Sequence, residues 1–253
     1  MTQGGRKVLV TGGSSGIGLA IARGFLENGD DVALCYRSRN ALSRADVRAV
    51  LDRFPHACAL QIDLSDSFNP SEVISDSSER LGGEVNVLVN NAAAISRAGF
   101  LDTKSDEFRD LMKVNVEAPY ALMKAFSSNL IEKSLIGSIV NISSLSSRMA
   151  RSRMPAYQCT KAALEMLTTS AAVELGPYGI RSNIIAPGLV ATPANASQWD
   201  LNPEQWKLRA AEIPLGRAGT PNDIVSAALF LSDERSSWVN GAKIVVDGGL
   251  SAY

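Results

Sequence analysis

The sequence has a single histidine and only three cysteines, which restricts the chemistry that it can support. His56 stands in a Phe-Pro-His turn, where we expect it at the surface, and this argues against a Ser-His-Asp triad or a zinc enzyme. Cys35, Cys58 and Cys159 have neither an even number nor the spacing of metal ligands. We therefore predict reduced thiols, a cytoplasmic protein and no metal site.

Strong charge and long apolar runs are also absent. The formal net charge is −1, and no run of lysines or arginines suggests a surface that binds nucleic acid. No stretch approaches the ~18 uninterrupted apolar residues that a membrane span needs. Residues 1–6 are polar and glycine-rich, without the apolar core of a signal peptide. We therefore expect neither nucleic acid nor a membrane as a partner.

Short apolar runs alternate with helical patterns along most of the chain. The strand-like runs are residues 7–11, 32–36, 57–62, 85–90, 138–143, 180–186 and 242–247. The helical stretches are residues 16–29, 41–53, 67–81, 103–133, 155–176 and 221–232. This order predicts an α/β fold with a doubly wound parallel sheet of about seven strands and helices on both faces. No repeat or polar linker divides residues 1–253, so we expect one domain.

The first strand-like run leads into a glycine-rich turn and then a helix, with the sequence TGGSSGIG from Thr11 to Gly18. Gly12 allows a tight turn, Gly16 leaves room for a pyrophosphate, and Gly18 lets the helix lie close to the strand. The free N–H groups at the start of the helix favour an anion. Taken alone, such a turn is as often only a tight connection between a strand and a helix.

Two further motifs carry reactive groups. Tyr157 and Lys161 are four residues apart at the start of a predicted helix, so they share one face. A nearby ammonium favours the phenolate and lowers the tyrosine pKa from its usual value of about 10. Ser144 follows the run 138–143 and precedes Tyr157 by 13 residues. In isolation, the Tyr-Lys spacing is more often a surface pair on an amphipathic helix.

Together these motifs resemble the classical short-chain dehydrogenase/reductase family. The resemblance covers nearly the whole chain and includes Asp63-Leu64, Asn90–Ala93, Asn115, Pro187-Gly188 and Val246–Gly249, in family order. It implies a single Rossmann-type domain that transfers hydride between a nicotinamide cofactor and the carbonyl or alcohol carbon of a small or carrier-linked substrate. Within the family, the pattern is closest to β-ketoacyl-carrier-protein reductases and to alcohol or sugar dehydrogenases.

The resemblance also implies four catalytic residues. Tyr157 is the general acid in reduction and the base in oxidation. Lys161 lowers the pKa of Tyr157 and holds the nicotinamide ribose. Ser144, rather than the adjacent Ser143, positions the substrate oxygen, because only Ser144 has the family spacing to Tyr157. Asn115 holds a water that links Lys161 to solvent.

The cofactor pocket implied by the resemblance draws on residues from most of the chain. They are Gly12, Ser14, Ser15, Gly16, Ile17, Gly18, Arg37, Ser38, Asp63, Leu64, Asn91, Ala92, Tyr157, Lys161, Pro187, Gly188, Val190 and Thr192. Two positions depart from the family pattern. Ala93 replaces the last glycine of the Asn-Asn-Ala-Gly motif, and Asn86 stands where the family often has aspartate. Neither change removes a catalytic group.

The residues after the second strand-like run favour NADP(H) over NAD(H). An acidic residue there would bind the ribose hydroxyls of NAD and repel a 2′-phosphate, and this chain has none. Arg37 instead offers a planar donor fork that suits a phosphate, with Ser38 and Arg39 beside it. The alternative is that these arginines are merely solvated. Ser15 stands where many NADP-dependent relatives carry a basic residue.

Two other functions stay open at this point: an enoyl reductase, which reduces C=C, and a non-catalytic NADP-binding regulator. The presence of Asn115, Ser144, Tyr157 and Lys161 argues against both. These motifs do not specify the substrate. Arginines 97, 148, 151 and 153 lie in loops that would line its pocket, where they either receive an acidic substrate or are solvated.

Two features predict how the chain moves and assembles. Residues 188–214 are irregular and proline-rich, contain Trp199 and Trp206, and are long for a simple connection, so we expect a flap over the substrate. The stretches 103–133 and 155–176 are apolar on more than one face. We expect them to pack against another subunit in a homotetramer.

Overall fold

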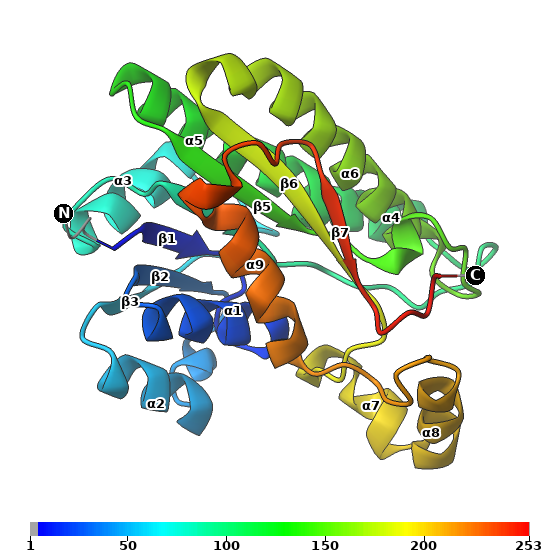
Figure 1. Ribbon diagram of the computed structural model, residues 1–253. Helices are drawn as coiled ribbons and strands as arrows, with labels where there is room; N and C mark the ends of the chain where they lie inside the picture. Colours follow the sequence, from blue (N-terminus) through cyan, green and yellow to red (C-terminus); the bar gives the residue numbers. More distant parts are fainter. Residues whose placement is uncertain (1–4, 253) are drawn as a thin grey trace.

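The computed structural model describes residues 5–252, apart from the side chains of Arg39 and Trp199, and in these residues the chain forms one sheet of seven parallel strands (Figure 1). The strand order is β3-β2-β1-β4-β5-β6-β7. The chain builds the sheet outward from β1 to β3, then crosses to β4 on the other side of β1. The carboxyl ends of β1 and β4 therefore flank the point where the winding reverses, which is where such sheets bind ligands.

The elements follow the predicted alternation, and the predicted fold class is confirmed. The strands are β1 Lys7–Val10, β2 Asp31–Tyr36, β3 Ala57–Gln61, β4 Val87–Asn90, β5 Gly137–Ile142, β6 Ile180–Pro187 and β7 Lys243–Val246. The helices are α1 Gly16–Glu27, α2 Ala45–Arg53, α3 Pro70–Arg80, α4 Ser105–Met112, α5 Ala118–Glu132, α6 Pro155–Leu175, α7 Ala196–Asp200, α8 Pro203–Ala211 and α9 Val225–Ser232.

The sheet separates two hydrophobic layers. Side chains alternate along β1, so that Val8 and Val10 enter one layer and Leu9 enters the other. The first layer is closed by α1 and α9, with Phe25 at its centre, and the second by α3 and α5, with Phe126. All five of these side chains are fully buried. Burial on both faces explains why the strands are short continuous apolar runs.

The stretch 103–133, predicted as one helical segment, is divided into three parts. A π-helical turn, Lys113–Glu117, separates α4 from α5. Pro119 lies in the first turn of α5 and has no N–H to donate to the carbonyl of Asn115, four residues earlier. The regular α-helical hydrogen bonding is therefore interrupted at this point, and the wider turn contains Asn115, whose side chain binds Ala94 in the loop after β4.

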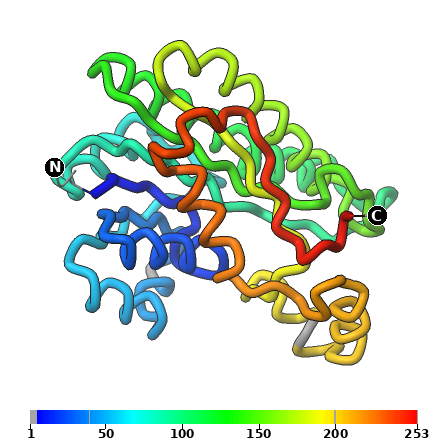
Figure 2. Tube along the Cα trace, in the orientation of Figure 1, coloured from blue at the N-terminus to red at the C-terminus, as the bar shows by residue number. Residues whose placement is uncertain are grey.

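Residues 188–214, predicted to be irregular, contain the two short helices α7 and α8, which project away from the sheet (Figures 1 and 2). The base of this segment is closed by a parallel bridge between Val190 and Gly219. The N–H of Gly219 donates to the carbonyl of Leu189 at 2.8 Å, and the N–H of Ala191 donates back to Gly219 at 2.9 Å. The segment thus leaves and re-enters the domain at one place.

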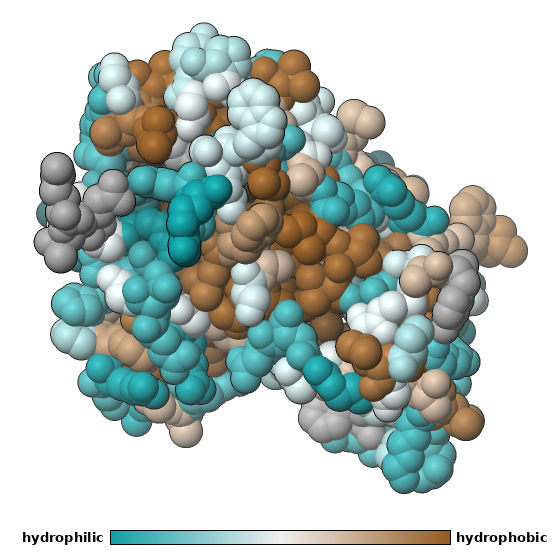
Figure 3. All heavy atoms as spheres, viewed as in Figure 1, coloured by the Kyte–Doolittle hydropathy of each residue, from teal (hydrophilic) through white to brown (hydrophobic). Residues whose placement is uncertain are grey.

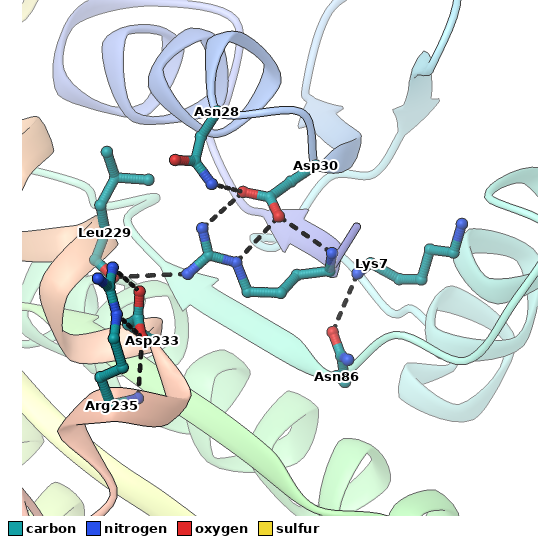
Figure 4. A network of polar contacts seen from close by, with 8 residues as sticks. Lys7, Asn28, Asp30, Asn86, Leu229, Asp233 and Arg235 are labelled. Carbon is teal, nitrogen blue, oxygen red and sulfur yellow. Dashed lines mark hydrogen bonds and ion pairs between the residues drawn. The ribbon is translucent and has the colours of Figure 1, made fainter. Parts of the chain in front are cut away.

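A buried ion pair fastens the start of β1 to the α1–β2 turn (Figure 4). The Arg6 guanidinium donates to both carboxylate oxygens of Asp30, at 3.0 and 2.6 Å, and lies 5.0 Å from the centre of the Phe25 ring. Asn28 donates to the same carboxylate at 3.1 Å, and Arg6 also reaches the carbonyl of Leu229 in α9. The cluster therefore ties together three segments that are distant in sequence.

Asn86, which stands where the family often has aspartate, has a structural role at the same edge of the molecule (Figure 4). Its side-chain oxygen accepts from the N–H of Lys7 at 2.9 Å, and its own N–H donates to the carbonyl of Lys7 at 3.0 Å. An aspartate would accept the same bond. This departure from the family pattern therefore leaves the β1–β4 pairing intact.

Candidate active site

A cavity of about 800 Å³ opens at the carboxyl ends of the strands, at the reversal point between β1 and β4. Its volume is in the range of sites that hold small molecules and cofactors. Its lining includes Gly12, Ser14, Ser15, Gly16, Ile17, Arg37, Ser38, Asp63, Leu64, Asn91, Ala92, Ser144, Tyr157, Lys161, Pro187, Gly188, Val190 and Thr192. The fold thus brings together at one cavity nearly all the residues predicted as a site. Gly18 and Asn115 lie outside this lining.

The glycine turn has the geometry of a phosphate cradle. Gly12 and Gly16 have φ angles of +61° and +52°, in the left-handed region that favours glycine. A Cβ at Gly18 would lie 2.3 Å from the carbonyl oxygen of Gly12, so Gly18 permits the close packing of helix on turn. The side chain of Ser15, at the N-cap of α1, does not cap the helix. The residues therefore fit a nucleotide pyrophosphate, which would meet open N–H groups here.

Asn91 holds this turn from the neighbouring strand. Its side-chain amide donates to the carbonyls of Thr11 and Gly12, at 2.9 and 3.2 Å. The Thr11 hydroxyl in turn accepts from the N–H groups of Asn91 and Ala92, at 3.0 and 3.1 Å. The sequence placed Asn91 beside the cofactor but missed Thr11. Their exchange of hydrogen bonds locks the end of β1 against the end of β4.

The far end of the cavity is basic rather than acidic. Arg37 is exposed directly after β2, and no carboxylate follows that strand. Asp63, which follows β3, interacts with the charge of Arg37. Hydrogen bonds from Ser65, and to a smaller extent the charge of Arg37, hold the pKa of Asp63 below its usual range. The Arg37 side chain is thus exposed at the position where the sequence analysis expects a 2′-phosphate to bind.

The predicted catalytic side chains meet at the opposite end of the cavity. Tyr157 and Lys161 lie on the first two turns of α6 and are 8 % and 2 % exposed. The Ser144 side chain is hydrogen-bonded to Tyr157, and its Oγ also accepts from the N–H of Ser146 at 3.1 Å. Lys161 Nζ donates to the carbonyl of Ile142, at the end of β5, at 2.8 Å. Two hydroxyls and one ammonium therefore face the same space.

The tyrosine pKa does not move in the direction expected from the sequence. Burial raises the pKa of Tyr157 to about 12, and the hydrogen bond with Ser144 and the charge of Arg97 oppose this only in part. Burial also lowers the pKa of Lys161 to about 8, against the charge of Glu165. The ammonium beside the phenol would lower the pKa of Tyr157, but the loss of solvent dominates the pKa of both groups in the protein without cofactor.

The side chain of Asn115 is fully engaged in hydrogen bonds within the protein. Its side-chain amide donates to the carbonyl of Ala94 at 2.9 Å and to the hydroxyl of Thr160 at 3.0 Å. Its side-chain oxygen accepts from the N–H of Ala94 at 2.7 Å. The side chain therefore ties the loop after β4 to α6, and the backbone carbonyl of Asn115 receives no hydrogen bond from Pro119, four residues later.

Two charged residues near the site were not found from the sequence. Glu165 and Lys243 form a buried ion pair, with Lys243 Nζ 2.7 Å from one carboxylate oxygen. Arg148, proposed above as a substrate arginine, lies 3.7 Å from the same carboxylate. Its charge is thus directed toward Glu165. No sequence motif marks Glu165 and Lys243, because they are 78 residues apart and meet only in the fold.

Three other arginines gather beside the catalytic end. Arg97 follows β4, Arg151 precedes α6, and Arg209 lies on α8. The charge of Arg97 acts on the Tyr157 phenol, and burial together with the charges of Arg151 and Arg97 lowers the pKa of Arg209. The Arg153 side chain links two of the loops by donating to the carbonyl of Arg97 at 3.4 Å. Like charges thus converge from three segments.

His56 and Cys35 do not have the surroundings of reactive groups. The His56 side chain is 65 % exposed and 3.5 Å from Asp31, which confirms its surface position. Cys35 is buried, and burial raises the pKa of its thiol to about 12. Within residues 5–252, no group of three histidine, cysteine, aspartate or glutamate side chains has the arrangement of a metal site. In the same part of the chain, no helix has the length and apolar character to cross a membrane.

Comparison with known proteins places the chain in a family. A family model described as enoyl-(acyl carrier protein) reductase matches residues 12–251. L-rhamnose 1-dehydrogenase (NAD(P)(+)) of Sphingomonas sp. is 34% identical over 247 residues, covering 97% of this chain and 96% of that protein. The chain belongs to the short-chain dehydrogenase/reductase family. This short-chain dehydrogenase/reductase is accordingly an NAD(P)-dependent oxidoreductase that acts on an alcohol or a carbonyl group.

Solved structures support the same assignment. A protein from Beutenbergia cavernae, described as an NAD(P)-dependent gluconate 5-dehydrogenase with NADP bound at low occupancy, has a TM-score of 0.90 and 33% identity, with 98% of each chain covered. A short-chain dehydrogenase/reductase from Burkholderia thailandensis has a TM-score of 0.87 and 32% identity, covering 99% of this chain and 94% of that chain. This enzyme thus shares its fold with its family along nearly its whole length.

Proposed function

We propose that this enzyme interconverts a carbonyl compound and its alcohol with NADP(H), and that Ser144, Tyr157 and Lys161 carry the reaction. The observation that supports this most is the shared cavity. The two hydrogen-bonded hydroxyls and the ammonium stand at one end, and the glycine turn and Arg37 stand at the other. A dinucleotide that spans this cavity would place its nicotinamide next to the hydroxyls and its adenosine phosphate next to Arg37.

Tyr157 is proposed to transfer the proton in the reaction. With a pKa of about 12, its phenol is protonated at neutral pH and is fitted to give a proton to a carbonyl oxygen. Ser144 donates a second hydrogen bond to the same oxygen. When bound, the cofactor supplies or accepts the hydride, and its oxidised ring adds a positive charge near the phenol. Lys161 would then act with that charge to lower the pKa for the reverse reaction.

The lysine also needs a path for protons. Lys161 is almost fully buried, and its ammonium is held by the carbonyl of Ile142. We propose that a water on the backbone carbonyl of Asn115 provides this path. Pro119 cannot donate to that carbonyl, so it keeps a free lone pair. The Asn115 side chain serves instead to hold Ala94, beside the cavity.

We propose NADP(H) rather than NAD(H) as the cofactor because the residue that follows β2 is positively charged. Arg37 is exposed there with Ser38 beside it, and no acidic residue competes with a 2′-phosphate. The nearest carboxylate, Asp63, is held by Ser65 through its hydroxyl at 2.5 Å and its N–H at 2.9 Å. Asp63 is therefore placed for the adenine rather than for repelling a phosphate.

The substrate is proposed to be a small hydroxylated anion, such as a sugar acid. The charge of Arg97 acts on Tyr157, and the charges of Arg97 and Arg151 both act on Arg209, where the charge of Glu212 opposes them only in part. An anionic substrate would relieve this repulsion. The family resemblance to enzymes that act on sugars and on a gluconate supports the same class. A carrier-linked phosphate would satisfy the same charges and is the second candidate.

Reduction of C=C is the alternative that the description of the matching family model raises. We favour the carbonyl because Ser144 and Tyr157 together offer two hydroxyls to a single oxygen, next to the point of hydride transfer. Reduction of an enoyl group requires no such pair at the reacting carbons. The distinction is chemical and can be read from the product.

We further propose a cytoplasmic homotetramer with a mobile flap at residues 188–214. Met166 and Val173, on α6, are 68 % and 76 % exposed. Figure 3 shows a second apolar face over α9 and β7. Phe230 of α9, Val245 of β7 and Trp238, between these two elements, are exposed. Two separate apolar faces are what an assembly with two kinds of interface needs. The three free thiols fit a reducing compartment.

One panel tests the function directly. Purified enzyme is assayed with NADPH and NADH against sugar acids, neutral sugars, keto esters and enoyl thioesters, and the products are identified by mass and by NMR. The proposal expects alcohol products, NADPH preference, and faster turnover of a keto or hydroxy acid than of its methyl ester. Saturation of a C=C bond in place of carbonyl reduction would overturn it.

A further inference from the structure

A buried ion pair joins the catalytic helix to the edge of the sheet. Glu165 lies two turns after Tyr157 on α6, and Lys243 is the first residue of the edge strand β7. Lys243 Nζ lies 2.7 Å from one oxygen of the Glu165 carboxylate and 3.0 Å from the other. The two side chains are 12% and 11% exposed. The pair is therefore largely shielded from solvent. None of the catalytic roles assigned above uses it.

The same carboxylate fastens the loop that carries Ser144. The hydroxyl of Ser143 donates to Glu165 at 2.8 Å, and the hydroxyl of Ser147 lies 2.5 Å from the same oxygen. Ser147 Oγ is also 2.8 Å from the carbonyl oxygen of Ser144 and accepts from Lys243 at 3.1 Å. Ser144 is therefore held on both sides by residues that are bound to the helix of Tyr157.

Glu165 also acts on Lys161, one turn earlier on the same helix. Burial lowers the pKa of Lys161, and the charge of Glu165 is the influence that opposes it. From other elements, Lys243 of β7 and Arg148 of the loop after β5 face Glu165. Tyr157 faces Lys161 along α6, and Asp110 of α4 lines the same cavity. The negative charge near Lys161 is thus balanced chiefly by Lys243.

We propose that Glu165 and Lys243 are a pair of positioning residues, which fix the Ser144 loop against the Tyr157 helix and set the electrostatic environment of the Lys161 ammonium. The proposal rests on the carbonyl reduction proposed above. A buried ion pair is in general a weak source of stability, because desolvation offsets the attraction. Its presence between the catalytic loop and the catalytic helix is better explained by geometry and charge than by stability alone.

Two single variants give opposite predictions. In Glu165→Gln the negative charge beside Lys161 is lost, so the alkaline limb of the kcat profile moves to lower pH, by about one unit. In Lys243→Met the carboxylate loses its main cation, so the limb moves to higher pH. Both variants keep NADPH affinity within about threefold of the parent, a change below about 0.7 kcal/mol. A purely structural role would lower melting temperature and kcat in both variants without moving the limbs apart.

Two further variants control for folding. Glu165→Gln combined with Lys243→Met leaves no lone buried charge, so its melting temperature recovers above those of the singles. Lys243→Arg keeps the charge and the parental pH profile. Glu27→Gln, which removes an exposed pair with Arg23, is the matched surface control. If Glu165→Gln alone fails to fold, the double variant is compared with Lys243→Met, from which it differs only by the loss of the Glu165 charge. The alkaline limb of the double variant is then expected at lower pH than that of Lys243→Met.

The outcomes separate the two proposals. Parental pH profiles in both single variants, or shifts in the same direction, overturn the positioning role. A parent enzyme that reduces no carbonyl compound contradicts the proposed function instead. In that case the pH dependence of melting of the cofactor-free protein still compares the variants, since Lys161 titrates there without turnover. Identical melting profiles in parent and Glu165→Gln would then also overturn the pair.

Discussion

Lys161 Nζ lies 5.7 Å from the centre of the Tyr157 ring and donates its hydrogen bond to the carbonyl of Ile142, rather than to the phenol. The ammonium thus stands over the face of the tyrosine, one helical turn away, with its charge anchored at the end of β5. Such a cation–π arrangement stabilises the charge in a buried place. It also leaves the Tyr157 hydroxyl free to bind Ser144 and a substrate oxygen.

This burial predicts how stability depends on pH. Unfolded, Lys161 titrates with its ordinary pKa of 10.5, and in the fold its pKa is about 8. Between these values the unfolded chain binds more protons, so the contribution of Lys161 to stability rises with pH, by about 3 kcal/mol in total. Below pH 8 Lys161 is charged in the folded protein as well, so the cost of burying the ammonium lowers the free energy of unfolding in full.

The measurement is urea unfolding of the cofactor-free protein at several pH values from 7 to 10. Lys161→Met removes the titrating group, so we expect it to be more stable than the parent at pH 7 and to lose this advantage as the pH rises. An unchanged difference between the two proteins across this range would contradict the account.

Arg37 is predicted to decide the choice of cofactor. Arg37→Asp replaces a donor for the 2′-phosphate with a group that repels it, so NADPH affinity falls by about 10- to 100-fold while NADH affinity rises or holds. Fluorescence titrations with both cofactors give the dissociation constants. Arg80→Asp, an equal change of charge at an exposed position of α3, is the control and should leave both dissociation constants unaltered. A parent enzyme that binds NADH more tightly would contradict the assignment.

Much of the site could be predicted because it is encoded locally. Gly12 and Gly16 must be glycine where φ is positive, and the spacing of Tyr157 and Lys161 fixes their shared face on any helix. The short apolar strands, buried on both faces, likewise predict a parallel sheet. Such signals lie within a few residues of one another, so reading them needs no knowledge of the tertiary fold.

The parts that were missed depend on tertiary contacts. Glu165 meets Lys243 across 78 residues, and nothing beside either residue in the sequence marks the pair. Asn115 was expected to hold a water, and nothing in the sequence shows that its side chain is bound to Ala94 and Thr160, which are 21 and 45 residues away. The pKa of Tyr157 was expected to fall, but the degree of burial is a property of the fold and not of a motif.

The Arg6–Asp30 pair is predicted to matter for stability. The Asp30 side chain is 4% exposed, and Arg6 is its ion-pair partner. Arg6→Ala would leave this carboxylate buried with only Asn28 and the Arg6 N–H as donors, at a cost of about 3 kcal/mol. Urea unfolding measures the loss. Arg235→Ala, which breaks an exposed pair with Asp233, is the matched control and should cost under about 1 kcal/mol.

Assembly is predicted to depend on the exposed apolar face of α6. Val173→Glu places a charge on a side chain that is 76% exposed in the single chain, so the fold is retained while the subunit contact is lost. Light scattering is expected to give a tetramer mass for the parent and a smaller mass for the variant, with unchanged circular dichroism. Glu174→Lys, a polar exchange next to it, controls for charge. A monomeric parent at micromolar concentration would contradict the predicted tetramer.

In the proposed mechanism, Tyr157 gives the proton while the rest of the cavity holds the cofactor. Tyr157→Phe removes only a hydroxyl, so it is expected to lower kcat by about 10²–10⁴-fold and to leave NADPH affinity unchanged. Tyr178→Phe, on an exposed ring in the turn that follows α6, is the matched control and should keep the parental kcat. Steady-state NADPH oxidation on a carbonyl substrate from the panel, paired with NADPH titration, decides the matter. Loss of turnover with intact binding is the predicted result, and a near-parental kcat in Tyr157→Phe would contradict the account.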